Sequence, residues 1–523
     1  MTLEDDMHPP TTVTDRPYSA VPATAPAAPA GPRDAPLAMA PDEFRQLGHA
    51  MVERIADHLA TLRDRPVTSG ASPDAIRARL GGDAPLPEVG TSAGPLLEDV
   101  AALLAEHSLF NAHPRFFGYI TASPAPIGML GDFLAAAMNP NLGSWILSPV
   151  ATEIEAQTVR WIAELLGFPR DAGGLLVSGG NMANTVALLA ARAARAGWDV
   201  RADGMRAADG RRLRVYASAE THTWVQKATD IAGLGTTAVR WIATDDAQRM
   251  DVAALRRAME EDEAAGDRPL LVVGTAGSVS TGAVDPLRAI AALCRERGIW
   301  FHVDGAYGGF AAALPDASDD LRALALADSV AVDPHKWLYA PLEAGCVLVR
   351  EAAHLRDAFS YHPPYYNFER EATNFVDLGP QNSRGFRALK VWLALRQVGR
   401  EGYVRSIGDD VRLSERLAER LRAHPEFEVL TQQLSITTFR WVPPALRAEP
   451  GDEAAQRRLD ELHDALLDRI EHSGEAFVSR AVVGGRVALR ACIVNFNTTA
   501  ADVDALPEIV ARLGREVESD RAR

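Results

Sequence analysis

The chain has 523 residues, more than one ordinary domain holds, so two or three folded units are expected. Hydrophobic residues make up 47% and charged residues 24% of the sequence, which is typical of a globular protein with a sizeable core. The formal net charge of −16 disfavours nucleic acid and anionic membranes as partners, because both are themselves polyanionic.

Cysteine and hydropathy patterns predict a cytoplasmic protein. The three cysteines, Cys294, Cys346 and Cys492, lie far apart, so we expect neither a disulfide framework nor a metal site. The acidic start, MTLEDDMHPP, lacks the apolar stretch of a signal peptide. No apolar run approaches the roughly 18 residues that a membrane span needs. We therefore expect no membrane partner.

The first 125 residues predict a tail followed by a helical segment. Residues 1–40 are rich in Pro, Ala and Thr, and such a composition favours a disordered tail. Residues 42–63 carry apolar side chains at helical spacing. We group residues 41–125 as an N-terminal helical segment.

The middle of the chain, residues 126–400, alternates helical patterns with short β-branched runs. Helices are expected at 152–167, 181–196 and 286–297, and strands at 213–218, 269–275, 299–304 and 329–333. This alternation predicts a large α/β domain with a mostly parallel sheet, whose ligands bind beyond the carboxyl ends of the strands. Residues 401–523 predict a small α+β domain, with a helix at 452–472 and strands at 435–441 and 486–496.

The segment DSVAVDPHKWLYAP holds the strongest candidate for a reactive group. Its apolar strand ends at Asp333, so His335 and Lys336 are expected at the mouth of the sheet. A lysine is rarely buried without a task, and a desolvated amine has a lowered pKa that suits bond formation with a carbonyl. A lysine at a strand end is nevertheless more often a surface residue, so other segments must support this interpretation.

Three further segments supply that support. Asp304 ends a strand in WFHVDGAYGGF, one β–α–β step before Lys336, and a carboxylate there could keep a pyridine nitrogen protonated, with Ala306 beneath the ring. The glycine turn of SGGN, residues 178–181, precedes a helix and suits a phosphate. His222 follows a strand and could stack on a ring. Alone, the strand-end Asp and the glycine turn are more often caps or turns, and the histidine is as often a helix cap as a ring contact, but their common order along one sheet is a strong signal.

This order resembles fold-type I pyridoxal-phosphate enzymes of the transferase-like class. The sequence motifs resemble still more closely those of the group II amino-acid decarboxylases, the family of aromatic-L-amino-acid, tyrosine, tryptophan, histidine and glutamate decarboxylases. The resembling segments are HPRFFGYITAS (113–123), SWILSPVATEIE (144–155), SGGNMAN (178–184), SAETHTWVQKA (218–228), HVDGAYGG (302–309), DPHKW (333–337) and SRGFRALKVW (383–392). The resemblance spans roughly residues 41–515.

The resemblance assigns the cofactor, pyridoxal 5'-phosphate, to a set of residues. Lys336 would carry it, Asp304 would pair with its ring nitrogen, and Ala306 and His222 would lie on its two faces. The remaining contacts would come from Gly179, Gly180, Asn181, Thr275, Ser278, Asp333 and His335. Asp333 replaces an Asn that contacts the phosphate in many relatives. Which of the two hydroxyls serves is open, because the loop varies in length across the family.

A lid at about 358–378 is also implied. Tyr365, or its neighbour Tyr366, would protonate the substrate carbon after carbon dioxide leaves. Arg384 aligns with an arginine that binds the substrate carboxylate in some members.

Substrate residues follow from the same resemblance. Phe116 and Tyr119 lie in a segment that lines the pocket of relatives. Ser383 stands where plant relatives have Ser with phenolic substrates and Gly with indolic ones.

The resemblance therefore implies decarboxylation of an L-amino acid, with an aromatic substrate favoured and aliphatic or acidic ones open. The main alternative is decarboxylation-coupled oxidative deamination to an aldehyde, which in this family tends to accompany loss of the lid Tyr or the stacking His. Another lyase, a transaminase or an inactive interaction protein are further alternatives, against which the decarboxylase motifs argue. A homodimer is implied, with sites between the subunits and the helix at 42–63 clasping the partner.

Overall fold

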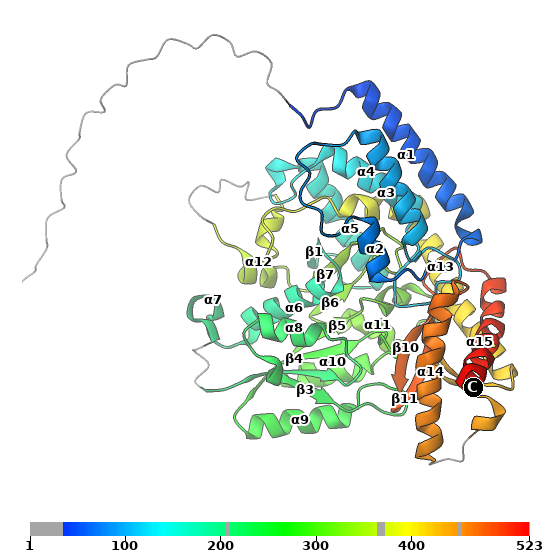
Figure 1. Cartoon of the computed structure of the whole chain (residues 1–523). Helices are drawn as coiled ribbons and strands as arrows, with labels where there is room; N and C mark the ends of the chain where they lie inside the picture. Colours follow the sequence, from blue (N-terminus) through cyan, green and yellow to red (C-terminus); the bar gives the residue numbers. More distant parts are fainter. Residues whose placement is uncertain (1–34, 206–209, 363–371, 448–451, 522) are drawn as a thin grey trace, which may run out of the picture. The chain divides into compact units, whose positions relative to one another are not determined.

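The computed structural model describes residues 35–205, 210–362, 372–447, 452–521 and 523 (Figure 1). The chain divides into two compact units, residues 1–57 and 58–523. Helix α1 (Pro41–Thr61) begins in the first unit, with Asp42 and Glu43 in its first turn, where the helix dipole favours negative charge. It matches the helix predicted at 42–63 to within two residues at each end.

A seven-stranded sheet forms the centre of the second unit, in the order β1-β7-β6-β5-β4-β2-β3. The strands are β1 (Gly173–Val177), β2 (Leu213–Ser218), β3 (Val239–Ile242), β4 (Arg268–Thr275), β5 (Trp300–Asp304), β6 (Ser329–Val332) and β7 (Gly345–Val349). Strand β7 pairs antiparallel with both neighbours, and the pairs from β3 to β6 are parallel. The predicted mostly parallel sheet is confirmed, and β3 and β7 are strands that the sequence patterns missed.

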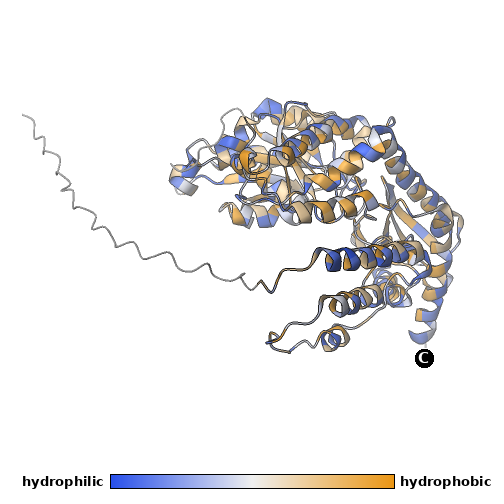
Figure 2. Cartoon of the chain, turned by 90° about the horizontal axis from the view of Figure 1, so that it is seen from above, coloured by the Kyte–Doolittle hydropathy of each residue, from blue (hydrophilic) through white to orange (hydrophobic). Residues whose placement is uncertain are grey.

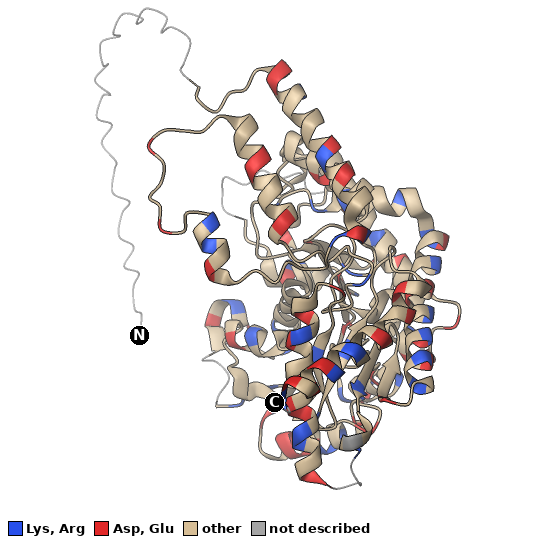
Figure 3. Cartoon of the chain, turned by 45° about the vertical axis from the view of Figure 1, so that its right-hand side comes forward, with Lys and Arg blue, Asp and Glu red and all other residues tan. Residues whose placement is uncertain are grey.

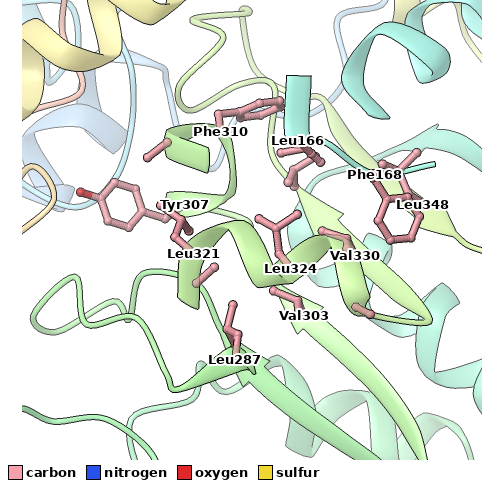
Figure 4. Close-up of a cluster of buried hydrophobic side chains, with 14 of the residues drawn as sticks. Leu166, Phe168, Leu287, Val303, Tyr307, Phe310, Leu321, Leu324, Val330 and Leu348 are labelled. Atoms are coloured by element: carbon pink, nitrogen blue, oxygen red, sulfur yellow. The ribbon is translucent and has the colours of Figure 1, made fainter. Parts of the chain in front are cut away.

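Helices cover both faces of this sheet. The main ones are α5 (Pro149–Leu166), α6 (Gly180–Arg195), α8 (Trp224–Ile231), α9 (Val252–Ala264) and α10 (Leu287–Arg297). Alternate strand residues point to opposite faces, so that Val303 and Val330 belong to one core and Ala331 to the other. Figure 4 shows the first core, where Leu166 of α5 and Leu287 of α10 meet these strands.

A four-stranded antiparallel sheet follows, in the order β10-β11-β9-β8. Its strands are β8 (Phe427–Gln433), β9 (Ile436–Trp441), β10 (Ser479–Val483) and β11 (Arg486–Cys492), and it packs with α13 (Ala388–Ala423), α14 (Glu453–Ser473) and α15 (Ala500–Arg521). Helix α13 crosses the domain boundary predicted at residue 400 and kinks one residue earlier, at Gly399, whose φ of 66° favours glycine. The last predicted strand ends at residue 492 rather than 496.

The remaining helices include α2 (Pro73–Arg79), α3 (Ala93–His107), α4 (Pro126–Met138), α7 (Val200–Asp203), α11 (Asp319–Arg322) and α12 (Ala353–Phe359). Most helices alternate hydrophilic and hydrophobic residues (Figure 2), and both signs of charge are interspersed along them (Figure 3). Among the described residues, no helix is both long and apolar enough to cross a membrane.

Candidate active site

The predicted site residues come together at the carboxyl ends of neighbouring strands. Asp304 is the last residue of β5, and Asp333 directly follows β6. Gly179 lies two residues after β1, and His222 four residues after β2. Because these strands are parallel members of one sheet, their carboxyl ends meet at a single edge, where such sheets bind ligands.

The glycine turn before α6 is closely packed. Gly179 caps α6 with a φ of +91°, a conformation that other residues rarely adopt. A Cβ atom on Gly180 would come within 2.7 Å of an Asp333 oxygen and 3.0 Å of the Ala306 Cβ, and one on Gly179 would lie 3.3 Å from His335. The turn therefore needs glycine at both positions, and it brings the free N–H groups of the helix terminus to the predicted phosphate position. The Asn181 side chain is exposed beside it.

Asp304 is held by two donors. Its Oδ2 accepts a hydrogen bond from the Trp224 indole N–H at 2.7 Å, and its Oδ1 accepts one from the backbone N–H of Ala306 at 3.1 Å. The residue is only 7% exposed. A buried, doubly bonded carboxylate is fixed in direction, as a partner for a ring nitrogen must be.

Trp224 is a site residue that the sequence analysis missed. It begins α8 two residues after His222 and is almost fully buried. A bulky aromatic residue so close to a candidate stacking histidine was a usable signal, but its hydrogen bond to Asp304 depends on the packing of α8 against β5.

Lys336 lies beside a second carboxylate. Its Nζ is 3.0 Å from Asp333 Oδ2, and its side chain is 18% exposed. His335 Nε2 lies 3.6 Å from the same oxygen, while His335 Nδ1 lies 2.7 Å from the Ala344 carbonyl oxygen. Burial lowers the pKa of His335, and Asp333 opposes that shift. Asp333 Oδ1 is buried without a hydrogen-bond partner among the described residues, so this carboxylate retains an acceptor at the turn.

His222 is electrostatically linked to the two predicted cofactor residues. Desolvation lowers its pKa, Asp304 raises it, and Lys336 lowers it further. Its Nδ1 accepts the backbone N–H of Trp224 at 3.2 Å, although much of the residue is open to solvent. A ring that is neutral at pH 7 can stack on an aromatic ligand without adding charge.

The two candidate hydroxyls differ in their surroundings. Thr275 Oγ1 lies 3.4 Å from the hydroxyl of Thr221, next to His222. Ser278 Oγ instead bonds Thr281 Oγ1 at 2.9 Å within its own loop. Thr275 is thus the hydroxyl closer to the other predicted residues.

The structure places Arg384 inside the protein and pairs it with a carboxylate. Its side chain is 1% exposed and forms a two-point ion pair with Glu155 of α5, which is fully buried. The guanidinium also donates to the carbonyl oxygens of Leu142 and Leu176 and lies 4.6 Å from the centre of the Phe375 ring. A guanidinium with these partners has its charge already neutralised inside the protein, so it is not presented to a substrate carboxylate.

The other substrate candidates differ in exposure. Phe116 is 3% exposed and stacks on Phe477 with ring centres 5.3 Å apart. Tyr119 and Ser383, by contrast, are exposed. Tyr365 and Tyr366 lie outside the described residues.

Arg490 is a second residue that the sequence analysis missed. It extends from β11, and its Nη1 donates to the carbonyl oxygen of Val279 in the loop after β4. Its Nε is buried without a partner among the described residues, and burial lowers its pKa. The bond to Val279, between segments 211 residues apart in the sequence, places Arg490 at the loop that follows β4.

These residues fit pyridoxal phosphate: a fixed carboxylate for the ring nitrogen, an amine for the carbonyl and a glycine turn at a helix N-terminus for the phosphate. The family described as pyridoxal-dependent decarboxylase conserved domain matches residues 76–441.

Sequence relatives and solved structures support the same family. An aromatic-L-amino-acid decarboxylase of Bacillus atrophaeus is 34% identical over 92% of this chain and 97% of its own length. A phenylacetaldehyde synthase of Arabidopsis thaliana is 31% identical over 86% of this chain and 92% of its own length. The crystal structure of Oryza sativa TDC with PLP and tryptamine superposes with a TM-score of 0.84 at 29% identity, covering 92% of this chain and 99% of that one.

The fold and the site thus define a carboxy-lyase of the fold-type I class whose cofactor is pyridoxal phosphate. The chain belongs to the pyridoxal-dependent decarboxylase family.

Proposed function

We propose that this chain converts an aromatic L-amino acid to the corresponding amine and carbon dioxide, with Lys336 as the residue that carries the cofactor. The observation that carries the proposal is the convergence of Lys336, Asp304 and the Gly179–Gly180 turn at one sheet edge. The names of the relatives, which include aromatic-amino-acid decarboxylases, support the aromatic class.

Each of the converging residues would have its own role in the reaction. When bound, pyridoxal phosphate supplies a carbonyl that condenses with amines and a ring that accepts electrons. Asp304, fixed by Trp224, keeps a proton on the ring nitrogen. Asp333 Oδ2, 3.0 Å from the Lys336 amine, would hold that amine in position at the sheet edge. Tyr365 would return a proton to the substrate carbon.

Arg490 is our candidate for the group that meets the substrate carboxylate, in place of Arg384. Arg384 already pairs with the Glu155 carboxylate, whereas Arg490 has no carboxylate partner among the described residues, and a substrate carboxylate would supply one. Tyr119, which is exposed on the single chain, is our candidate for a side chain beside the substrate.

We also propose a cytoplasmic homodimer. Helix α4 leaves a row of apolar side chains exposed on the single chain, namely Leu130, Phe133, Leu134 and Met138. A second copy would cover such a patch. Sedimentation at micromolar concentration should give twice the chain mass of 56.3 kDa, and a species of single mass would refute the dimer.

The test of the activity is a product survey. Purified protein with pyridoxal phosphate is incubated with each proteinogenic L-amino acid and with DOPA, and products are identified by mass spectrometry. An amine from an aromatic substrate is expected, and none from the Lys336→Ala variant. An aldehyde with peroxide would favour the alternative that the phenylacetaldehyde synthase relatives suggest. Amines from aliphatic or acidic substrates alone would refute the aromatic assignment.

A further inference from the structure

Asp410 of α13 is a buried carboxylate that faces the segment following the candidate cofactor lysine. Its Oδ2 accepts hydrogen bonds from the Trp337 indole N–H at 2.9 Å and from the Tyr339 hydroxyl at 2.7 Å. These two residues follow Lys336 by one and three positions. Because Asp410 is almost fully buried, the protein and not water must satisfy its oxygens.

The segment that Asp410 holds has an uncommon backbone. Tyr339 adopts a φ of +51°, in the left-handed region that residues other than glycine seldom occupy. Its N–H donates to the Lys336 carbonyl oxygen at 3.0 Å, and the Lys336 N–H donates to Asp333 at 2.9 Å. Such a conformation persists only where the surroundings determine it, and the hydroxyl bond to Asp410 is one of the contacts that do so.

Trp337 is held from a second side by the segment that follows Asp304. The Tyr307 ring stacks on it with centres 4.7 Å apart. The Tyr307 hydroxyl lies 2.8 Å from Ser435 Oγ, and Figure 4 shows it directed away from the labelled core leucines. Trp337 thus links the Asp304 segment, Lys336 and α13.

We propose that Asp410 is a positioning residue for Lys336: by fixing Trp337 and Tyr339 it sets the direction in which Lys336 presents its amine. This inference rests on the proposed function, in which Lys336 carries the cofactor. Both contacts are made by donors, an N–H and an O–H, and the charged carboxylate of Asp410 accepts them more strongly than the neutral acid does.

The charge of Asp410 also depends on pH near neutrality. Burial raises the pKa of Asp410 to about 7, against the opposing effect of its bonds to Tyr339 and Trp337. The titratable groups that face it or its partner Tyr339 are Asp409, Tyr307, Tyr403 and Cys492. As the pH falls through 7, the carboxylate gains a proton and its hold on the segment weakens.

The test uses Asp410→Asn, with Asp409→Asn as the matched control. Asp409 is the neighbouring residue on α13, is exposed and pairs with Arg412. For each apoenzyme, pyridoxal phosphate is added and the appearance of the visible absorbance band of the lysine-bound cofactor is timed between pH 6 and 9. Thermal unfolding, kcat and KM are measured on the same samples.

We expect Asp410→Asn to slow the appearance of the absorbance band and to lower kcat by about tenfold or more, the effect of removing the charge from the acceptor of two buried hydrogen bonds. KM should change by less than about threefold, since substrate is not touched. The acid-side decline of the rate near pH 7 should vanish in Asp410→Asn and persist in Asp409→Asn, where it should move to slightly lower pH because Asp409 raises the pKa of Asp410. Rates and pH profiles equal to those of the control would overturn the proposal.

Two further variants keep the test decisive if Asp410→Asn does not fold. Tyr339→Phe and Trp337→Phe each remove one hydrogen-bond donor and leave the buried carboxylate in place. In each variant the absorbance band of the lysine-bound cofactor should appear about threefold more slowly, or slower still. In a folded Asp410→Asn background, Tyr339→Phe should add nothing, and independent, multiplying effects would refute the shared role. Lys336→Ala separates the two ideas, because persistence of a lysine-bound band there would refute the proposed function itself.

Discussion

Arg384 offers the sharpest test of the structure, because the sequence and the fold assign it different roles. Its ion pair with Glu155 has both side chains almost completely buried. In Arg384→Leu the Glu155 carboxylate would keep the Leu176 N–H, at 2.9 Å, but lose its counter-charge. Breaking a buried pair in this way costs about 3–5 kcal/mol, so the urea midpoint of the apoenzyme, followed by tryptophan fluorescence, should fall clearly.

Two comparisons make that result specific. Arg387→Leu, three residues away, removes a partly exposed pair with Glu343 and should cost at most about 1 kcal/mol. The double variant Glu155→Leu with Arg384→Leu removes both charges and should be less destabilised than the sum of its parts. If Arg384→Leu instead kept the wild-type midpoint and raised KM by about tenfold or more, the arginine would be a substrate ligand and its buried pairing would not describe the working enzyme.

Two further predictions concern buried rings. Trp224→Phe removes the indole N–H that holds Asp304, so kcat should fall by about 10- to 100-fold. The control is Trp300→Phe, which should lower kcat less because the Trp300 indole bonds the neutral Ser329 hydroxyl. Equal losses of kcat in the two variants would contradict the special role of Trp224. Burial lowers the pKa of His463 to about 4, and its Nε2 accepts a hydrogen bond from the backbone N–H of Trp441 at 3.0 Å. The folded state therefore favours the neutral imidazole ring. The unfolded ring takes up a proton below about pH 6.5, so stability present above 6.5 is lost as the pH falls toward 4, by up to about 3 kcal/mol. Unfolding midpoints from pH 4 to 8 should therefore fall less steeply for His463→Gln, and parallel curves would refute this account.

Much of the candidate site was predictable from short stretches of sequence. Lys336, Asp304 and the Gly179–Gly180 turn each follow a run of apolar residues that indicates a buried strand, and the carboxyl ends of parallel strands meet at one edge of a sheet. For the same reason the large α/β domain could be predicted before the sheet order was known. The sequence pattern did not reveal that β7 is antiparallel, because its apolar run is as short as those of the parallel strands.

Contacts between distant segments were not predictable, because a sequence shows which groups can pair and not which ones do. An arginine in a family motif suggested a substrate ligand, and only the packing of α5 under β1 brought Glu155 against Arg384. The bond from Trp224 to Asp304 depends likewise on how α8 packs on the sheet.

The sequence by itself determined the class of chemistry, since the groups that it requires stand at local, recognisable positions. The tertiary structure decided how those groups are held. Trp224 bonds Asp304, and Asp410 bonds Trp337 and Tyr339 in the segment after Lys336. Arg384 forms a buried ion pair with Glu155. The physical reason is that burial gives these hydrogen bonds and charges their strength, and burial is a property of the folded chain that no single segment contains.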